Sequence, residues 1–255
     1  MNLKELSMNK FLRSKFSKKI RNFLNIKPSF DLVDYTLKNI SVSDAFFWRT
    51  DDGFKTIFRF TNIIKFFYGE KELDLKVIFF DRNNKFIKKI YISSTTSNEL
   101  VIDKSFLNNI SSYGVFYVFH KSSNKFNGII RNSCYTGYSF KNSIPSFVHG
   151  NIIVAEQNLE NMKITYGLGG VSFFKKFTYK IQNYFNYEAT EIMLINPTKK
   201  KINILVNDNE LNLDKGCSII VKINKSKLIE ITSNCYLLRP IVFTYNNSFF
   251  DVYHG

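Results

Sequence analysis

Apolar and polar positions alternate in short runs along most of this chain. After Pro28, runs rich in Phe, Ile, Val and Tyr are broken by clusters of Asn, Asp, Gly and Ser, which is typical of strands joined by turns. The first half predicts strands at 43–48, 54–61, 73–80, 86–92, 99–103 and 114–120. The second half predicts strands at 162–166, 171–180, 189–195, 201–206, 217–223, 228–232, 236–244 and 249–253. We therefore expect an all-β fold of the sandwich type.

The two halves repeat one strand pattern in the same order. The matching segments are Thr56–Asn62 with Glu191–Pro197, Leu75–Phe80 with Ile202–Val206, Glu99–Asp103 with Ser218–Lys222, and Gly114–Phe119 with Arg239–Phe243. This order predicts an internal duplication, with β-sandwich domains at 31–155 and 156–255 and a boundary within 150–163. The strand order of each half resembles tandem immunoglobulin-like sandwiches in a general way, and that resemblance implies no particular activity.

Residues 1–30 predict a basic amphipathic helix. Apolar residues recur at three- and four-residue steps from Met8 to Leu24. The basic residues on the rest of this helix are Lys10, Arg13, Lys15, Lys18, Lys19 and Arg21. Such a helix can contact an anionic membrane surface through these six residues, or it can pack its apolar face on the following domain. The sequence leaves both alternatives open.

The formal charge of +15 raises the alternative of a nucleic-acid partner. Of the 36 basic residues only seven are Arg, however, and the bidentate Arg fork is favoured for base and phosphate recognition. The Lys excess accompanies an excess of Asn, Ile, Phe and Tyr, a bias that an A+T-rich genome would produce without any nucleic-acid function. We therefore rank nucleic-acid binding last.

The cysteines Cys134, Cys217 and Cys235 are odd in number and have no CxxC spacing, so the sequence predicts neither a disulfide framework nor a zinc site. No run of 18 apolar residues occurs, and the N-terminal residues lack the apolar core of a secretion signal. We expect a cytoplasmic protein, peripheral at the inner membrane surface if the basic helix binds there. No cofactor is expected, and the oligomeric state is not indicated.

The segment from Arg131 to Asn151 holds the most concentrated candidate chemistry. Its Arg131, Tyr135, Tyr138 and His149 combine a guanidinium, two aromatic rings and an imidazole, groups that can line a polar ligand site. The alternative is a long hairpin whose tyrosines pack and whose glycines turn.

All three histidines lie at the ends of aromatic strands. His120 follows Tyr117–Phe119, and His149 and His254 are each followed by glycine at the ends of the two halves. Three imidazoles can bind a transition metal, but no HxH or HExxH spacing supports such a site. We therefore expect structural strand ends, no metal site and no catalytic residue, and keep His120 and His149 as ligand-binding candidates.

A second polar-aromatic cluster precedes the strand predicted at 54–61. It contains Asp44, Trp48, Arg49, Asp51 and Asp52. Trp48, the only tryptophan, can stack on a sugar ring, although a single tryptophan is more often part of a core. The aspartates can hold calcium or act as acid and base, but they have no second carboxylate pair at a fixed spacing.

These observations favour a non-catalytic binding or accessory protein that recognises a glycan or a protein partner. A different class is an enzyme that acts on carbohydrate through Arg131, Tyr135, Tyr138 and His149, joined by His120. The sequence contains no Walker A motif, no strand-linked GxGxxG and no GxSxG elbow. A non-specific nucleic-acid binder is the third alternative.

Overall fold

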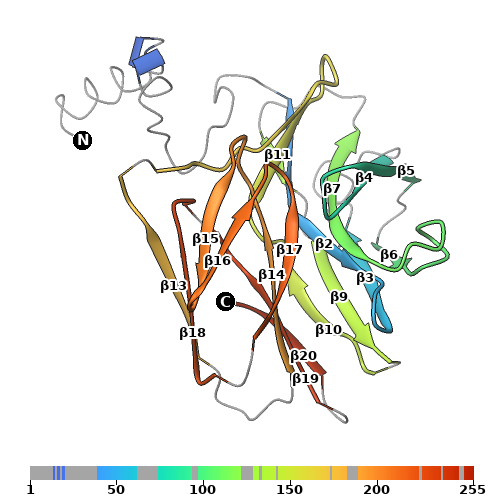
Figure 1. The fold of residues 1–255 in the computed structure, drawn as a ribbon. Coiled ribbons are helices and arrows are strands. Elements are labelled where there is room, and N and C mark those ends of the chain that lie inside the picture. The colour runs from blue at the N-terminus through green and yellow to red at the C-terminus, as the bar shows by residue number, and fades with distance from the viewer. Residues whose placement is uncertain are drawn as a thin grey trace, which may run out of the picture.

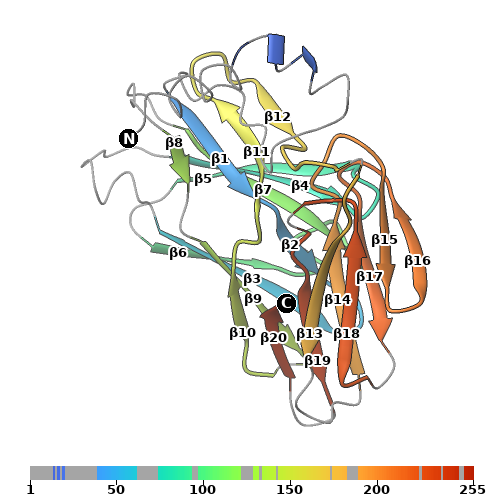
Figure 2. The same ribbon diagram turned by 90° about the vertical axis from the view of Figure 1, so that its left-hand side faces the viewer.

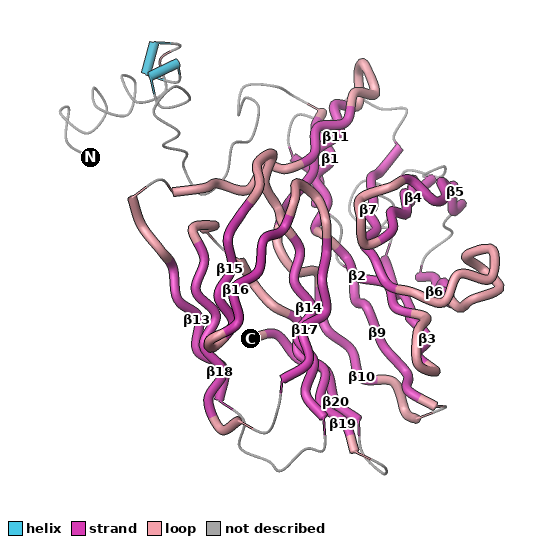
Figure 3. The backbone as a smooth tube through the Cα atoms, viewed as in Figure 1, coloured by secondary structure: helices cyan, strands magenta, loops and turns pink. Residues whose placement is uncertain are grey.

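A computed structural model shows a fold that is nearly all β (Figures 1 and 3). It describes residues 14, 16–17, 19–20, 39–61, 74–93, 97–121, 129–131, 134–141, 143–172, 174–182, 189–223, 226–236, 238–246 and 250–255. Within these residues, twenty strands form five sheets of four strands each. The all-β prediction is confirmed. Two immunoglobulin-like domains, which would contain four sheets, are not confirmed.

Two sheets of the first half face each other and form the first sandwich. One has the order β2 (Phe46–Arg49), β7 (Tyr113–Lys121), β4 (Asp74–Asp81) and β5 (Phe86–Ser93). The other has the order β10 (Ser146–His149), β9 (Cys134–Phe140), β3 (Phe54–Thr61) and β6 (Ser97–Ile102). Aromatic side chains such as Trp48, Phe58, Phe79 and Phe116 fill the core between them.

The second half forms a second sandwich of the same kind. Its first sheet has the order β13 (Phe177–Gln182), β18 (Leu228–Ser233), β15 (Ile202–Val206) and β16 (Asn209–Leu213). Its second sheet has the order β17 (Ser218–Ile223), β14 (Ala189–Ile195), β19 (Ile241–Tyr245) and β20 (Phe250–His254). This core is aliphatic, with Ile192, Leu194, Ile204 and Ile231 at its centre.

A fifth sheet, called here the bridging sheet, lies beside the first sandwich (Figure 2). Its order is β12 (Ile164–Tyr166), β11 (Ile153–Asn158), β1 (Ile40–Asp44) and β8 (Ile129–Arg131), and β1 runs parallel to β8. The Ser43 hydroxyl on β1 accepts a hydrogen bond from the Val118 backbone N–H on β7 at 2.7 Å. The sheet thereby fixes the ends of β1 and β8, which carry two residues of the candidate site.

The sandwiches meet along a buried apolar interface, called here the seam. Phe47, Tyr117 and Tyr138 of the first sandwich pack there with Met193 and Phe243 of the second. On β7, Phe116 and Val118 face the first core while Tyr117 and Phe119 face the seam. Because such strands are buried on both faces, they appear in the sequence as continuous apolar runs.

The two sandwiches have the same strand order. In chain order, β2 to β7 followed by β9 and β10 occupy the places that β13 to β20 occupy in the second sandwich. The first three segment pairs of the predicted repeat therefore fall on equivalent strands. The fourth pair is wrong. Gly114–Phe119 lies in β7, and the strand equivalent to β7 is β18. The matched segment 239–243 instead leads into β19, which is equivalent to β9.

Most of the predicted N-terminal helix lies outside the described residues, including Lys10, Arg13, Lys15, Lys18 and Arg21. Phe16, Ser17, Lys19 and Ile20 are described and helical, and the Phe16 side chain is 65% exposed. Among the described residues, no helix combines the length and the apolar character needed to cross a bilayer.

Candidate functional site

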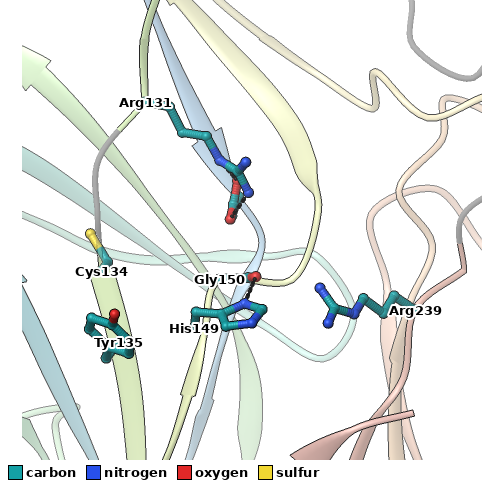
Figure 4. A pocket seen from close by; sticks show the side chains of 7 residues that line it. Arg131, Cys134, Tyr135, His149, Gly150 and Arg239 are labelled. Carbon is teal, nitrogen blue, oxygen red and sulfur yellow. Dashed lines mark hydrogen bonds and ion pairs between the residues drawn. The ribbon is translucent and has the colours of Figure 1, made fainter.

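A pocket of about 490 Å³ opens where the bridging sheet and both sandwiches come together (Figure 4). We call it the seam pocket. β1, β8, β9 and β10 supply residues from one side, and the loop before β19 supplies one from the second sandwich. Its lining residues are Asp44, Arg131, Cys134, Tyr135, His149, Gly150 and Arg239.

Arg131 and Asp44 form a two-point ion pair on one wall. Arg131 Nε donates to Asp44 Oδ1 at 3.0 Å, and Nη2 donates to Oδ2 at 2.7 Å. The Asp44 side chain is 5% exposed, while that of Arg131 is 51% exposed. The hydrogen bonds to Asp44 raise the pKa of the Arg131 guanidinium above its ordinary value. Arg131 is thus held in place, and its exposed part faces the pocket.

His149 ends β10 at the centre of the pocket. Its Nδ1 lies 3.1 Å from the Gly150 carbonyl oxygen, which can only accept, so the neutral ring carries its proton on Nδ1. Nε2 is then left as an acceptor. The His254 ring lies against the His149 ring in a tilted arrangement, at 4.7 Å between centroids, and His254 Nε2 donates to the His149 carbonyl oxygen at 2.9 Å. The matching ends of β10 and β20 therefore meet across the seam.

Arg239 brings a second guanidinium from the second sandwich. Its backbone carbonyl accepts a hydrogen bond from Asn151 Nδ2 at 2.6 Å, which joins its loop to the residue after Gly150. Figure 4 shows its side chain extending toward His149 from the side opposite Tyr135. No carboxylate in the described part of the chain forms an ion pair with Arg239. The lining therefore carries two guanidinium groups against one carboxylate, and that carboxylate is already paired.

Tyr135 and Cys134 close the pocket on the β9 side. The Tyr135 side chain is 51% exposed and offers an aromatic face at the mouth. Cys134 is buried, and burial raises the pKa of its thiol well above the ordinary value. At neutral pH the thiol is protonated, which removes the nucleophilic thiolate form.

The structure gathers three of the six predicted ligand-binding residues, Arg131, Tyr135 and His149, in one pocket. The β9–β10 hairpin brings two of them together, because it pairs Tyr135 directly with His149, while Arg131 reaches the pocket from β8 of the bridging sheet. Their role in binding stays a prediction.

The other three predicted residues are buried elsewhere. Trp48 is fully buried in the first core, with its Nε1 donating to the Phe80 carbonyl at 2.8 Å. The Tyr138 hydroxyl donates to the Phe47 carbonyl at 3.0 Å inside the seam. His120 is 1% exposed where β7 lies against β1. None of these three side chains lines the seam pocket.

Sequence reasoning did not place Asp44, Cys134, Gly150 or Arg239 in this site. The sequence pattern groups Asp44 with the aspartates before β3, but Ala45 separates β1 from β2, and Asp44 ends β1 beside Arg131. Arg239 had no local signal, since it is a single arginine before Pro240. Only the packing of the second sandwich brings it to His149.

The described residues contain no group of three His, Cys, Asp or Glu side chains that could hold a metal ion. Asp51 and Asp52 lie close to Arg49. No protein-family model matches the chain, and no curated protein matches it either.

His254 makes stability at the seam depend on pH. Burial first, and the nearby Arg239 and His149 in addition, lower the pKa of His254 from 6.5 to about 4. Between these two pH values, His254 binds a proton in the unfolded chain but not in the folded chain. The free energy of unfolding should therefore fall as the pH drops through this window. Replacing His254 by Gln should reduce the loss of Tm between about pH 7 and about pH 4.5. Thermal unfolding curves that shift equally for both proteins would contradict this assignment.

Proposed function

We propose that this chain is a non-catalytic binding protein whose seam pocket holds the acidic group of a glycan. The observation that carries the proposal is the guanidinium of Arg239, which has no ion-pair partner among the described residues and lies beside His149, facing Arg131 across the pocket. A guanidinium presents a planar fork of donors that matches a carboxylate or sulfate in two-point contact. Among the described lining residues, the one that is acidic is Asp44, and it is already held by Arg131.

The remaining lining groups suit a sugar ring. The exposed Tyr135 face can stack on the apolar face of a pyranose, and His149 Nε2 can accept a hydrogen bond from a sugar hydroxyl. Binding sites of this kind combine an aromatic wall with a few polar groups that set orientation.

Replacing Arg239 by Ala is expected to weaken binding of D-glucuronate. A charge-assisted hydrogen bond contributes about 1.5 to 3 kcal/mol, so the dissociation constant should rise about ten- to a hundredfold. Isothermal titration calorimetry with glucuronate, and with neutral glucose for comparison, measures the change.

The matched control is Arg82→Ala, since Arg82 is an exposed arginine on the β4–β5 turn and does not line the pocket. It should leave glucuronate binding unchanged. An equal loss in both variants would show that only the general positive charge matters, and an unchanged affinity in Arg239→Ala would reject the site.

The enzyme alternative has less support. It needs Tyr138 beside Arg131, Tyr135 and His149, with His120 as an optional member, but the side chains of Tyr138 and His120 are buried away from the pocket. The protonated Cys134 thiol adds no nucleophile.

We also propose that the chain is a duplicated pair of immunoglobulin-like domains, at 31–155 and 156–255. The common strand order of the two sandwiches supports the duplication. Membrane contact by the basic helix is likewise a proposal, and the exposure of the apolar Phe16 and Ile20 side chains supports it.

A further inference from the structure

A second pocket, of about 380 Å³, lies at another part of the boundary between the halves. The first sandwich contributes Asn84 from the β4–β5 turn and Tyr117 from β7, and Tyr166 ends β12 of the bridging sheet. The second sandwich contributes Lys199 and Lys215 from the loops that follow β14 and β16. This pocket shares no lining residue with the seam pocket.

Tyr117 is the most unusual residue of the second pocket. Its side chain is 1% exposed, and its ring packs against those of Tyr166 and Phe80 at 5.0 and 5.7 Å between centroids. No described residue forms a hydrogen bond with its hydroxyl, although Tyr117 lines the pocket wall. The hydroxyl is not among the described polar atoms that are both sealed from solvent and without a partner, so it reaches the pocket, where a ligand group can accept its hydrogen bond.

The charged side chains that line the pocket among the described residues are both cationic donors. Burial raises the pKa of Tyr117, and it raises that of Tyr166 to about 12, so both hydroxyls keep their protons at neutral pH. Lys199 and Lys215 add two ammonium groups, and no carboxylate lines the pocket among the described residues. The complement of such walls is a ligand rich in acceptors that carries negative charge.

The loop that carries Lys199 is rigidly held. Asn196 Nδ2 donates to the carbonyls of Lys200 and Leu213 at 2.6 and 2.8 Å, and its Oδ1 accepts from the Thr198 backbone at 2.9 Å. On the other side, a Cβ on Gly216 would lie 2.6 Å from Asn84 Nδ2, so the β4–β5 turn and the β16–β17 connection touch closely. The pocket is therefore largely formed before any ligand arrives.

We propose that this second pocket is a separate site for an acidic saccharide, with the anionic substituent held by Lys199 and Lys215. A ring or hydroxyl oxygen accepts the hydrogen bond of Tyr117, and the sugar lies against the ring of Tyr166. The proposal is independent of the seam pocket, because it uses different residues and a different unpaired donor.

The test measures binding of glucose 6-sulfate, D-glucuronate and glucose by calorimetry in an Arg239→Ala background, which removes the free guanidinium of the seam pocket. Tyr117→Phe deletes only the hydroxyl, and should raise the dissociation constant of the charged sugars about three- to tenfold without lowering Tm. The double variant Lys199→Ala and Lys215→Ala should raise it by at least about tenfold.

Lys201→Ala is the matched control, because Lys201 is exposed and does not line this pocket. It should leave the affinity unchanged. Absence of binding by either charged sugar in the Arg239→Ala background would overturn the proposal. So would a loss in Lys201→Ala as large as that in the double variant, or binding that Tyr117→Phe leaves unchanged. None of these results decides the proposal for the seam pocket. That proposal is tested separately, by comparing Arg239→Ala with the otherwise native chain.

Discussion

Replacing Arg49 by Ala is expected to lower the free energy of unfolding by about 3 to 5 kcal/mol, because it leaves a buried carboxylate without its main partner. Arg49 ends β2 and is 1% exposed. Its Nη1 donates to Glu191 Oε2 on β14 of the second sandwich, and its Nε donates to Asp51 at 2.8 Å. The guanidinium also lies 3.8 Å from the centroid of the Phe54 ring.

The electrostatics of this group favour the charged form despite its burial. Burial alone lowers the pKa of Arg49, but Asp51 and Glu191 outweigh it, and the net shift is upward. Without Arg49, the Glu191 carboxylate, which is 1% exposed, keeps only Lys222 at 3.7 Å as an ion-pair partner among the described residues. The pair joins the two sandwiches, so its loss should weaken the seam and not only one core.

Urea denaturation measures the effect, and the exposed pair of Arg59 and Glu99 is the matched control. These side chains are 56% and 42% exposed, so Arg59→Ala should cost no more than about 1 kcal/mol. The double variant Arg49→Met and Glu191→Leu should recover much of the stability, because it buries no unpaired charge. A loss in Arg49→Ala no greater than that in Arg59→Ala would contradict the prediction.

Replacing Gly150 by Ala is expected to weaken the proposed binding of glucuronate in the seam pocket. A Cβ at this position would lie 2.1 Å from Asp44 Oδ2 and 2.8 Å from its Cγ, closer than real Cβ contacts allow. Asp44 cannot simply turn away, since it is nearly buried and held at both oxygens by Arg131. The overlap should cost about 1 to 3 kcal/mol of stability. The affinity for glucuronate should fall by at least about tenfold as Arg131 and His149 shift.

The control for this prediction is the double variant Gly150→Ala with Asp44→Ala, which removes the overlapping carboxylate. Denaturation and glucuronate titration of both single variants and the double variant complete the cycle. If the overlap is the cause, the double variant should be more stable than the sum of the two single losses predicts. Strictly additive losses would show that Gly150 acts in another way.

The local pattern of residues was enough to predict the strand-rich class and much of one site. Runs of aromatic and β-branched residues between turn residues form strands wherever they pack, so 54–61 is matched by β3 at Phe54–Thr61. The segment from Arg131 to Asn151 contains three of the lining residues. The β9–β10 hairpin pairs Tyr135 with His149, and Arg131 ends β8 shortly before β9. The sequence pattern also predicted that both halves repeat one order of strands, and the two sandwiches share one strand order.

Long-range packing decided the rest. Period-two patterns do not distinguish a polar residue that faces a pocket from one buried at a sheet contact, and so Trp48, Tyr138 and His120 could not be separated from the lining residues beforehand. The bridging sheet pairs β1 with β8. These two strands lie far apart in the sequence, and no local turn signal joins them. Arg239 reaches His149 only because the second sandwich packs against the first across the seam. The strands follow from local propensity, whereas the charge of each pocket depends on which loops that packing brings together.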